Sequence, residues 1–246
     1  MNASLLLDVQ GVSKYFGGLR ANEDISFQVS KGQILSIIGP NGAGKSTLFN
    51  CITGFHHLDK GRVLFKGLDI TNWKPHTIGK LGVVRTFQIT QVISDMTVLE
   101  NVMTGGFLRH VRVKDVRLNA EEVLAFTGLN AKQNYNAQAL SVSDKKRLEV
   151  SMALAMEPEL LMLDESMAGL TPVELKDMIE LIRKVRAKGI AIVVVEHVME
   201  AVMELSDRVL VLNSGRRIAE GSPKEVVADR EVIRAYLGDR YHAVCP

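Results

Sequence analysis

The amino-acid sequence predicts an α/β fold built around a parallel β-sheet. Three mostly apolar runs have the length and composition of strands that are covered on both faces, at residues 34–38, 160–163 and 190–195. A long amphipathic helical pattern at residues 172–188 separates the last two runs. Because alternation of strand, helix and strand is typical of parallel sheets, these three runs and the helix define the predicted core.

The other elements are predicted from turn residues and from the period of the apolar positions. Residues 99–157 show helical periodicity with many charged side chains, which indicates a helical insertion between the core strands. The remaining predictions are, in chain order, strands at 5–9 and 25–29 around a turn at Gly17 and Gly18, a helix at 46–53, a strand at 61–67, a hairpin at 209–219 and a helical tail at 224–237.

Composition and charge exclude several classes of protein. The 246 residues are 46% hydrophobic and 24% charged, which is typical of globular proteins and not of disordered chains. A net charge of +2 gives no argument for a nucleic-acid partner. Cys51 and Cys245 have no metal-ligand spacing, so a reducing compartment is expected. We also expect neither secretion nor a membrane span, because no run approaches the ~20 apolar residues required.

A glycine-rich segment directly after the first core strand matches the phosphate-loop pattern G-x-x-x-x-G-K-[ST]. Glycines allow backbone N–H groups to converge on phosphate oxygens, Lys45 reaches the β- and γ-phosphates, and the Ser46 hydroxyl ligates Mg²⁺. A glycine-rich turn with an incidental lysine is the alternative, which the flanking strand and helix disfavour. We therefore expect a purine nucleoside triphosphate with Mg²⁺ to bind Gly39, Pro40, Asn41, Gly42, Ala43, Gly44, Lys45, Ser46 and Thr47.

Polar residues follow the next two core strands, where parallel strands place them at one edge of the sheet. Asp164 is expected to hold Mg²⁺ and Glu165 to orient and deprotonate the attacking water. His197 follows Val195 and Glu196, near the same edge, and is a candidate to bond the γ-phosphate or the water. The alternatives are a solvated acidic pair and a loop histidine without a role. The second reading is preferred for the other five histidines, His56 included.

Taken together, these motifs resemble the ATP-binding subunit of an ATP-binding cassette (ABC) transporter, and the resemblance covers nearly the whole chain. It implies that Phe16 stacks on adenine and that Gln88 contacts Mg²⁺ and the water and relays to a membrane subunit. Asp164 and Glu165 match the family's Walker B pair, and His197 matches its switch histidine.

The resemblance also implies an architecture, which is a P-loop NTPase (RecA-like) core with an N-terminal antiparallel β-subdomain and an inserted helical subdomain. We expect one ABC ATPase domain over residues 1–246. Within it, the approximate divisions are 1–89 and 158–222 for the nucleotide-binding core with its β-subdomain, 90–157 for the helical subdomain and 223–246 for a C-terminal helical tail.

Several segments resemble the branched-chain amino-acid uptake branch of the family, and a urea or amide importer is the alternative within that branch. The segments are 14–19, 97–102, 168–170 and 232–238. The resemblance implies two membrane permease subunits, a second ATPase subunit, an indirect link to a solute-binding protein, and a position at the cytoplasmic face of the inner membrane.

The chain departs from the family at the signature motif, usually Leu-Ser-Gly-Gly-Gln, which here reads Leu-Ser-Val-Ser-Asp at residues 140–144. In the family this motif closes over the γ-phosphate bound to the opposite subunit, where Ser141 is expected to donate a hydrogen bond. Val142 and Ser143 crowd that approach, and Asp144 adds negative charge. Ser166 and Thr171 also replace the usual proline and aspartate. We therefore expect a non-identical ATPase partner, in an asymmetric heterodimer.

Two further readings belong to other functional classes. The altered signature is compatible with a nucleotide-gated regulatory or interaction subunit that hydrolyses ATP weakly. Soluble ABC proteins of translation or DNA repair usually have two cassettes or a long coiled-coil insertion, and neither is found in these 246 residues.

Overall fold

The structure, a computed structural model, describes residues 4–86 and 92–237. Its larger sheet has six strands in the order β10-β9-β3-β8-β7-β6. Five neighbouring strands, β9, β3, β8, β7 and β6, run parallel to one another, and β10 is antiparallel to β9. Their bounds are Val83–Arg85 for β6, Leu160–Asp164 for β7, Ala191–Val195 for β8, Ile34–Ile38 for β3, Arg208–Asn213 for β9 and Arg216–Gly221 for β10. The predicted α/β fold is confirmed.

A second, antiparallel sheet has the order β2-β1-β4-β5. Its strands are β1 (Leu5–Phe16), β2 (Leu19–Ser30), β4 (Lys60–Phe65) and β5 (Leu68–Asp69). The prediction of short strands at 5–9 and 25–29 was wrong in length. Register shifts between Val9 and Val12, where Gly11 has φ 58°, interrupt the period of two on which strand recognition depends.

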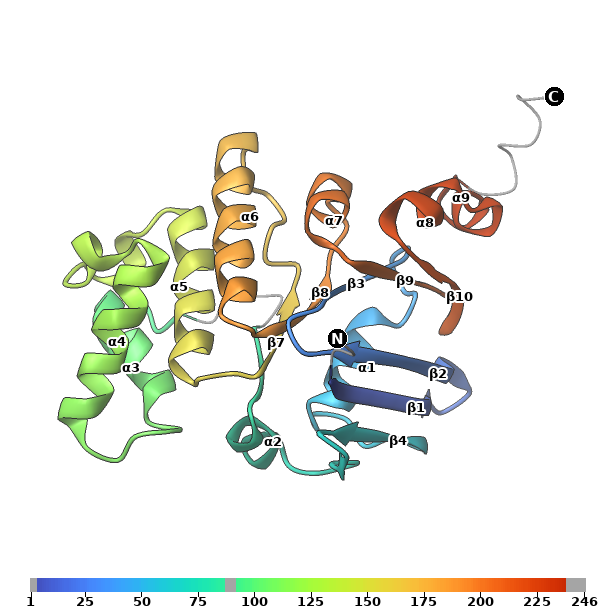
Figure 1. Cartoon of the computed structure of the whole chain (residues 1–246), viewed down its shortest axis with the longest axis horizontal. Coiled ribbons are helices and arrows are strands. Elements are labelled where there is room, and N and C mark those ends of the chain that lie inside the picture. The colour runs from blue at the N-terminus through green and yellow to red at the C-terminus, as the bar shows by residue number, and fades with distance from the viewer. Residues whose placement is uncertain (1–3, 87–91, 238–246) are drawn as a thin grey trace.

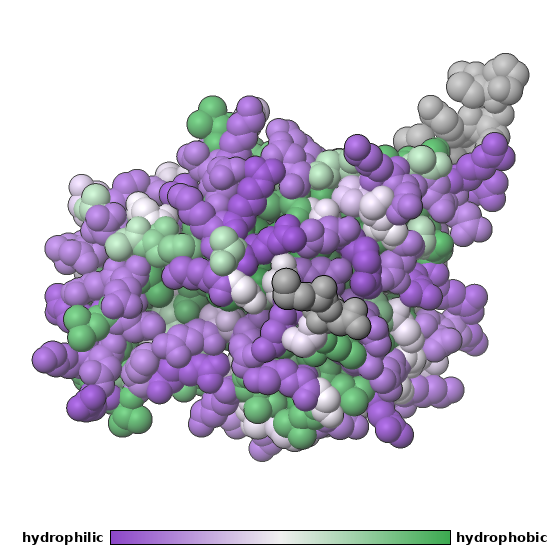
Figure 2. Space-filling model, in the orientation of Figure 1, coloured by the Kyte–Doolittle hydropathy of each residue, from purple (hydrophilic) through white to green (hydrophobic). Residues whose placement is uncertain are grey.

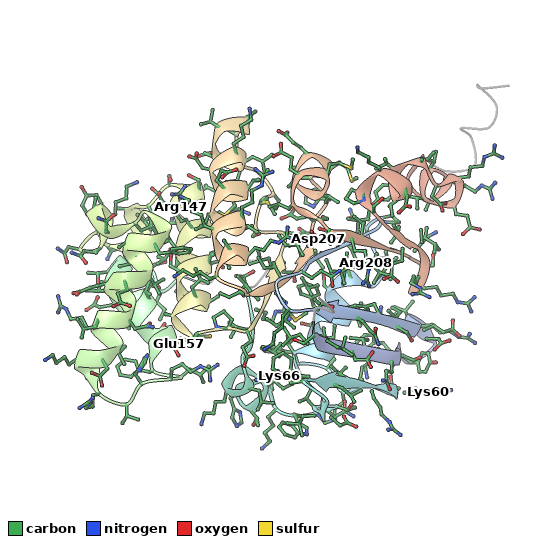
Figure 3. The ribbon with its side chains drawn as sticks, in the orientation of Figure 1. Lys60, Lys66, Arg147, Glu157, Asp207 and Arg208 are labelled. Atoms are coloured by element: carbon green, nitrogen blue, oxygen red, sulfur yellow. The ribbon has the colours of Figure 1, made fainter. Side chains whose placement is uncertain are left out.

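The helix α1 (Lys45–Ile52) lies between the two sheets, and its Leu48, Phe49 and Ile52 side chains are fully buried there. One apolar cluster joins this helix to both sheets, so α1 is held from two sides. Asp207, labelled in Figure 3, adds a polar tie at the core: it accepts a hydrogen bond from the Ile34 backbone and pairs with Arg186, both at 2.8 Å.

The predicted helical insertion forms α3 (Val98–Gly106), α4 (Val113–Thr127) and α5 (Val142–Ala155), which group at one end of the molecule (Figure 1) and share their own apolar cluster. The division of the chain into the subdomains given above stays a prediction. The other helices are α2 (Pro75–Leu81), α6 (Pro172–Ala187), α7 (Met199–Leu205), α8 (Pro223–Ala228) and α9 (Arg230–Leu237), with 3₁₀ turns at Asn130–Lys132 and Ala137–Ala139.

Hydrophilic side chains dominate the face shown in Figure 2, with hydrophobic ones in scattered groups. Over residues 4–86 and 92–237, no helix is both long enough and apolar enough to span a bilayer.

Candidate active site

The phosphate loop is shaped by direct contact between backbone segments. Gly39 and Gly44 have φ of 152° and 96°, which L side chains rarely adopt. A Cβ on Gly39 would lie 2.1 Å from the carbonyl oxygen of Leu212, and one on Gly44 would lie 2.2 Å from that of Ala21. Because backbone oxygens occupy these positions, only glycine fits either of them.

A neighbouring turn closes one side of the loop. The Gly215 N–H donates to the carbonyl oxygen of Ala43 at 3.1 Å, and the carbonyl oxygen of Gly215 accepts from the Glu23 N–H at 2.8 Å. The Asn22 side chain donates to the carbonyl oxygen of Gly44 at 3.1 Å. Hydrogen bonds from two distant parts of the sequence, at Asn22 and at Gly215, thus hold the loop in place.

Lys45 begins α1 and is 8% exposed. Its Nζ donates to the carbonyl oxygens of Gly39 at 2.8 Å and Pro40 at 3.1 Å, so the side chain folds back along the loop. Burial lowers the pKa of Lys45, and the carboxylates of Glu165 and Asp164 oppose this effect. The Lys45 ammonium is therefore held under the loop. Two of its three N–H groups donate to the carbonyl oxygens, and the third remains for a phosphate oxygen.

A pocket of about 740 Å³ opens above the loop. It brings together most of the predicted site residues: Phe16, residues 41–47 of the loop, and Glu165. Leu19, Arg20, Ala21 and Ser214 complete its lining. Gly39 and Pro40 lie beneath it as acceptors for Lys45. Gln88 lies outside the described residues.

Phe16 is 43% exposed at the pocket wall. The ring of His56 packs against it edge-to-face, with centroids 5.4 Å apart, and the Lys14 Nζ lies 5.2 Å from the Phe16 centroid. His56 was not expected to have a role, because the contact joins residues 40 positions apart and no local sequence pattern indicates it.

Asp164 ends β7 in a buried position beside Arg85, the last residue of β6. The Arg85 Nη2 lies 3.1 Å from the Asp164 Oδ2, with the two side chains 8% and 2% exposed. Burial raises the pKa of Asp164, which the Arg85 guanidinium opposes. The Asp164 Oδ1 is buried and has no hydrogen-bond partner among the described residues. No local sequence pattern indicates Arg85, whose partner is 79 positions away.

Glu165 follows directly with φ 51°, a backbone conformation that turns the chain away from the strand. Its N–H donates to the carbonyl oxygen of Val195 at 2.9 Å, and its carbonyl oxygen accepts from Lys146 at 3.1 Å. The His197 Nδ1 lies 3.9 Å from the Glu165 Oε1, so the structure brings together two of the three predicted catalytic residues. His197 is exposed.

Ser141 is the N-cap of α5 and does not line this chain's pocket. Its hydroxyl accepts from the Asp144 N–H at 3.2 Å and donates to the Asp144 Oδ2 at 3.0 Å. Lys132 forms an ion pair with the same carboxylate. The Asp144 charge is therefore compensated, and the Ser141 hydroxyl is engaged within the chain.

Comparisons with known proteins agree with this geometry. The family described as ABC transporter matches residues 22–168. The chain belongs to the ABC transporter family. The C-terminal model of the branched-chain amino acid ATP-binding cassette transporters matches residues 216–242 of this cassette. ATP and Mg²⁺ are its cofactors, and ATP hydrolysis coupled to transport is its activity.

Relatives and solved structures cover nearly all of the cassette. The high-affinity branched-chain amino acid transport ATP-binding protein LivG of Escherichia coli is 39% identical, over 95% of this chain and 98% of its own. The probable branched-chain amino acid transport ATP-binding protein LivG of Archaeoglobus fulgidus is 37% identical, over 95% of both chains. A nucleotide-free ATP-binding cassette from an ABC transporter has a TM-score of 0.89 at 34% identity, covering 96% of this chain and 100% of its own.

The residues of the site fit a magnesium nucleotide. A buried carboxylate oxygen without a partner, the Asp164 Oδ1, is an acceptor of the type that Mg²⁺ prefers. The loop backbone and Lys45 supply donors and positive charge for the phosphates. Among the described residues, the phosphate-binding groups lie at the start of α1, and the Asp164 carboxylate lies at the end of β7.

Proposed function

We propose that this cassette powers the import of branched-chain amino acids. The match of residues 216–242 to the branched-chain amino acid cassettes carries this proposal, because it lies outside the part of the chain that matches ABC transporters in general. The names of the relatives support the same solute class.

The proposal assigns each site residue a role. The loop of residues 39–47, which includes Lys45, binds the phosphates of ATP, and the Phe16 ring stacks on adenine. Ser46, Asp164 and Gln88 hold Mg²⁺, which when bound draws charge from the phosphate oxygens. Glu165 accepts the proton of the attacking water, and His197 bonds the water or the γ-phosphate. Except for Gln88, whose role rests on the resemblance alone, each role is supported by the chemistry of a group that lies at or beside the pocket.

The proposal includes partners. Two permease subunits hold the cassette at the cytoplasmic face of the inner membrane, and a solute-binding protein delivers the cargo to the permeases. Purification of the complex in detergent should recover the permeases with this chain. Their solute-binding protein should bind leucine, isoleucine or valine in calorimetric titration. Binding of urea or a short-chain amide, with no response to the three amino acids, would instead establish the alternative cargo.

The second ATPase subunit is proposed to be non-identical. The signature of this chain holds its Ser141 hydroxyl on Asp144, so that donor is not directed outward from α5. Val142 is 63% exposed at the start of the same helix, where the family has glycine. A nucleotide bound to the partner and facing this signature is therefore hydrolysed slowly, and the site with this chain's phosphate loop hydrolyses faster. Turnover of the purified chain alone that equals that of the full transporter would contradict this asymmetry.

Asp144→Gln is expected to increase hydrolysis at the slow site. In a complex whose fast site is blocked by Glu165→Gln, the residual ATPase rate should rise by up to roughly tenfold, because one hydrogen bond contributes about 0.5–1.5 kcal/mol. The measurement is steady-state phosphate release. Asp177→Asn, which removes an exposed carboxylate 4.0 Å from Arg147, is the control. An unchanged or lower residual rate with Asp144→Gln would show that the hydrogen bond between Ser141 and Asp144 does not limit this site.

A further inference from the structure

Arg85 occupies the junction of three elements next to the active site. It ends β6, which pairs in parallel with β7, and its side chain is 8% exposed. Its Nη1 donates to the Asn50 Oδ1 at 2.5 Å and the Thr53 Oγ1 at 3.4 Å, both at the end of the phosphate-loop helix α1. Its Nη2 donates to the Asp164 Oδ2 at 3.1 Å. One guanidinium thus connects the end of α1 to the end of β7.

The two oxygens of Asp164 have different environments. The Oδ2 accepts from Arg85, whereas the Oδ1 is buried with no hydrogen-bond partner among the described residues. A buried carboxylate oxygen normally finds a donor, so an unpaired one indicates a group that binds there. Because Arg85 engages only one oxygen, it determines which oxygen stays free.

The surroundings restrict movement of the Arg85 guanidinium. Its Nε donates to the carbonyl oxygen of Thr86 at 3.1 Å, and the rings of Phe49 and Phe55 lie 5.9 Å and 5.5 Å from its central carbon. The Asp164 backbone is held as well, since its N–H donates to the Thr86 Oγ1 at 3.2 Å. A planar fork with fixed donors orients a carboxylate, which a flexible ammonium does less well.

We propose that Arg85 is a positioning residue that holds the Asp164 carboxylate with its Oδ1 directed to Mg²⁺, and thereby sets the Mg²⁺ affinity of the nucleotide site. Partners that orient a metal ligand commonly change metal affinity by 10–100-fold when replaced. A purely structural role predicts something else. Loss of a buried ion pair then lowers stability and weakens nucleotide binding equally with and without metal.

The test measures Mg²⁺-dependent binding of a fluorescent ADP analogue to the purified full chain. Arg85→Lys keeps the charge and loses the fork. It should raise the Mg²⁺ concentration for half-maximal enhancement of binding by roughly 10–100-fold, while affinity in EDTA stays within about twofold. An unchanged Mg²⁺ concentration for half-maximal enhancement would overturn the proposal. An equal loss of nucleotide affinity with Mg²⁺ and with EDTA would also overturn it.

Two further variants keep the test decisive. Arg109→Lys is the matched control, because Arg109 donates to the backbone carbonyls of Lys80, Met156 and Glu157 and does not contact Asp164. If Arg85→Lys fails to fold, Asn50→Ala replaces it, since this change removes one anchor of the guanidinium and keeps its charge. A higher Mg²⁺ concentration for half-maximal enhancement of binding in Asn50→Ala supports the proposal, and an unchanged concentration overturns it.

The inference rests on the proposed assignment of Asp164 to Mg²⁺. Nucleotide binding by the unaltered chain that does not respond to Mg²⁺ would overturn that assignment itself. A Mg²⁺-responsive chain with a normal Arg85→Lys variant would overturn only the role of Arg85.

Discussion

Glu165→Gln is expected to keep ATP binding and to reduce steady-state turnover by roughly 10²–10⁴-fold, the usual contribution of a general base. Glu165 lines the pocket with the phosphate loop, and its Oε1 lies 3.9 Å from the His197 Nδ1. Glutamine has nearly the same shape and cannot accept the proton. The measurement is ATPase activity of the assembled transporter, together with ATP affinity of the same preparation.

A matched control separates this loss from a general loss of charge. Glu180→Gln replaces an exposed glutamate that pairs with Arg183 on α6, and it should leave turnover unchanged. The backbone contacts of Glu165 with Val195 and Lys146 do not depend on its carboxylate, so the fold of the variant should be retained. Normal turnover in Glu165→Gln would reject Glu165 as the base.

Lys45→Ala is expected to abolish most ATP binding. The lost ammonium contributes charge-assisted hydrogen bonds to phosphate, each of about 1.5–3 kcal/mol, which corresponds to roughly 10–150-fold in affinity. The change also removes the donor that links the carbonyl oxygens of Gly39 and Pro40, so the loop loses an internal brace. The measurement is the dissociation constant for ATP with Mg²⁺.

Lys45→Gln distinguishes the two contributions. Glutamine can still donate to the carbonyl oxygen of Gly39 and carries no charge. If the brace alone mattered, this variant would bind ATP normally. We expect it to remain at least tenfold weaker than the unaltered chain, because the phosphate charge is then uncompensated. Near-normal affinity in both variants would contradict the role of Lys45 in phosphate binding.

The sequence predicted the parts of the site that are local in the chain. The phosphate loop and the pair Asp164 and Glu165 are short patterns attached to strands, so their chemistry and their position at the sheet edge both follow from sequence order. The parallel core was predictable for the same reason, since its buried strands are continuous apolar runs.

The neighbours that orient these residues were not predictable. Arg85 meets Asp164, and His56 meets Phe16, only after distant segments have packed together. The lengths of β1 and β2 were underestimated because bulges interrupt their alternation. The compensation of charge in the signature motif was not predictable either. The sequence shows that Asp144 adds a negative charge, but only the fold shows that Lys132 forms an ion pair with it.

The contacts of Gly39 and Gly44 with the carbonyl oxygens of Leu212 and Ala21 affect how this site can diverge over evolution. Main-chain atoms are common to all sequences, so a loop shaped by them places few demands on the identity of surrounding side chains. A solved cassette that shares 34% of its residues with this chain has a TM-score of 0.89 to it. The backbone of the loop can thus keep its shape while the side chains around it change.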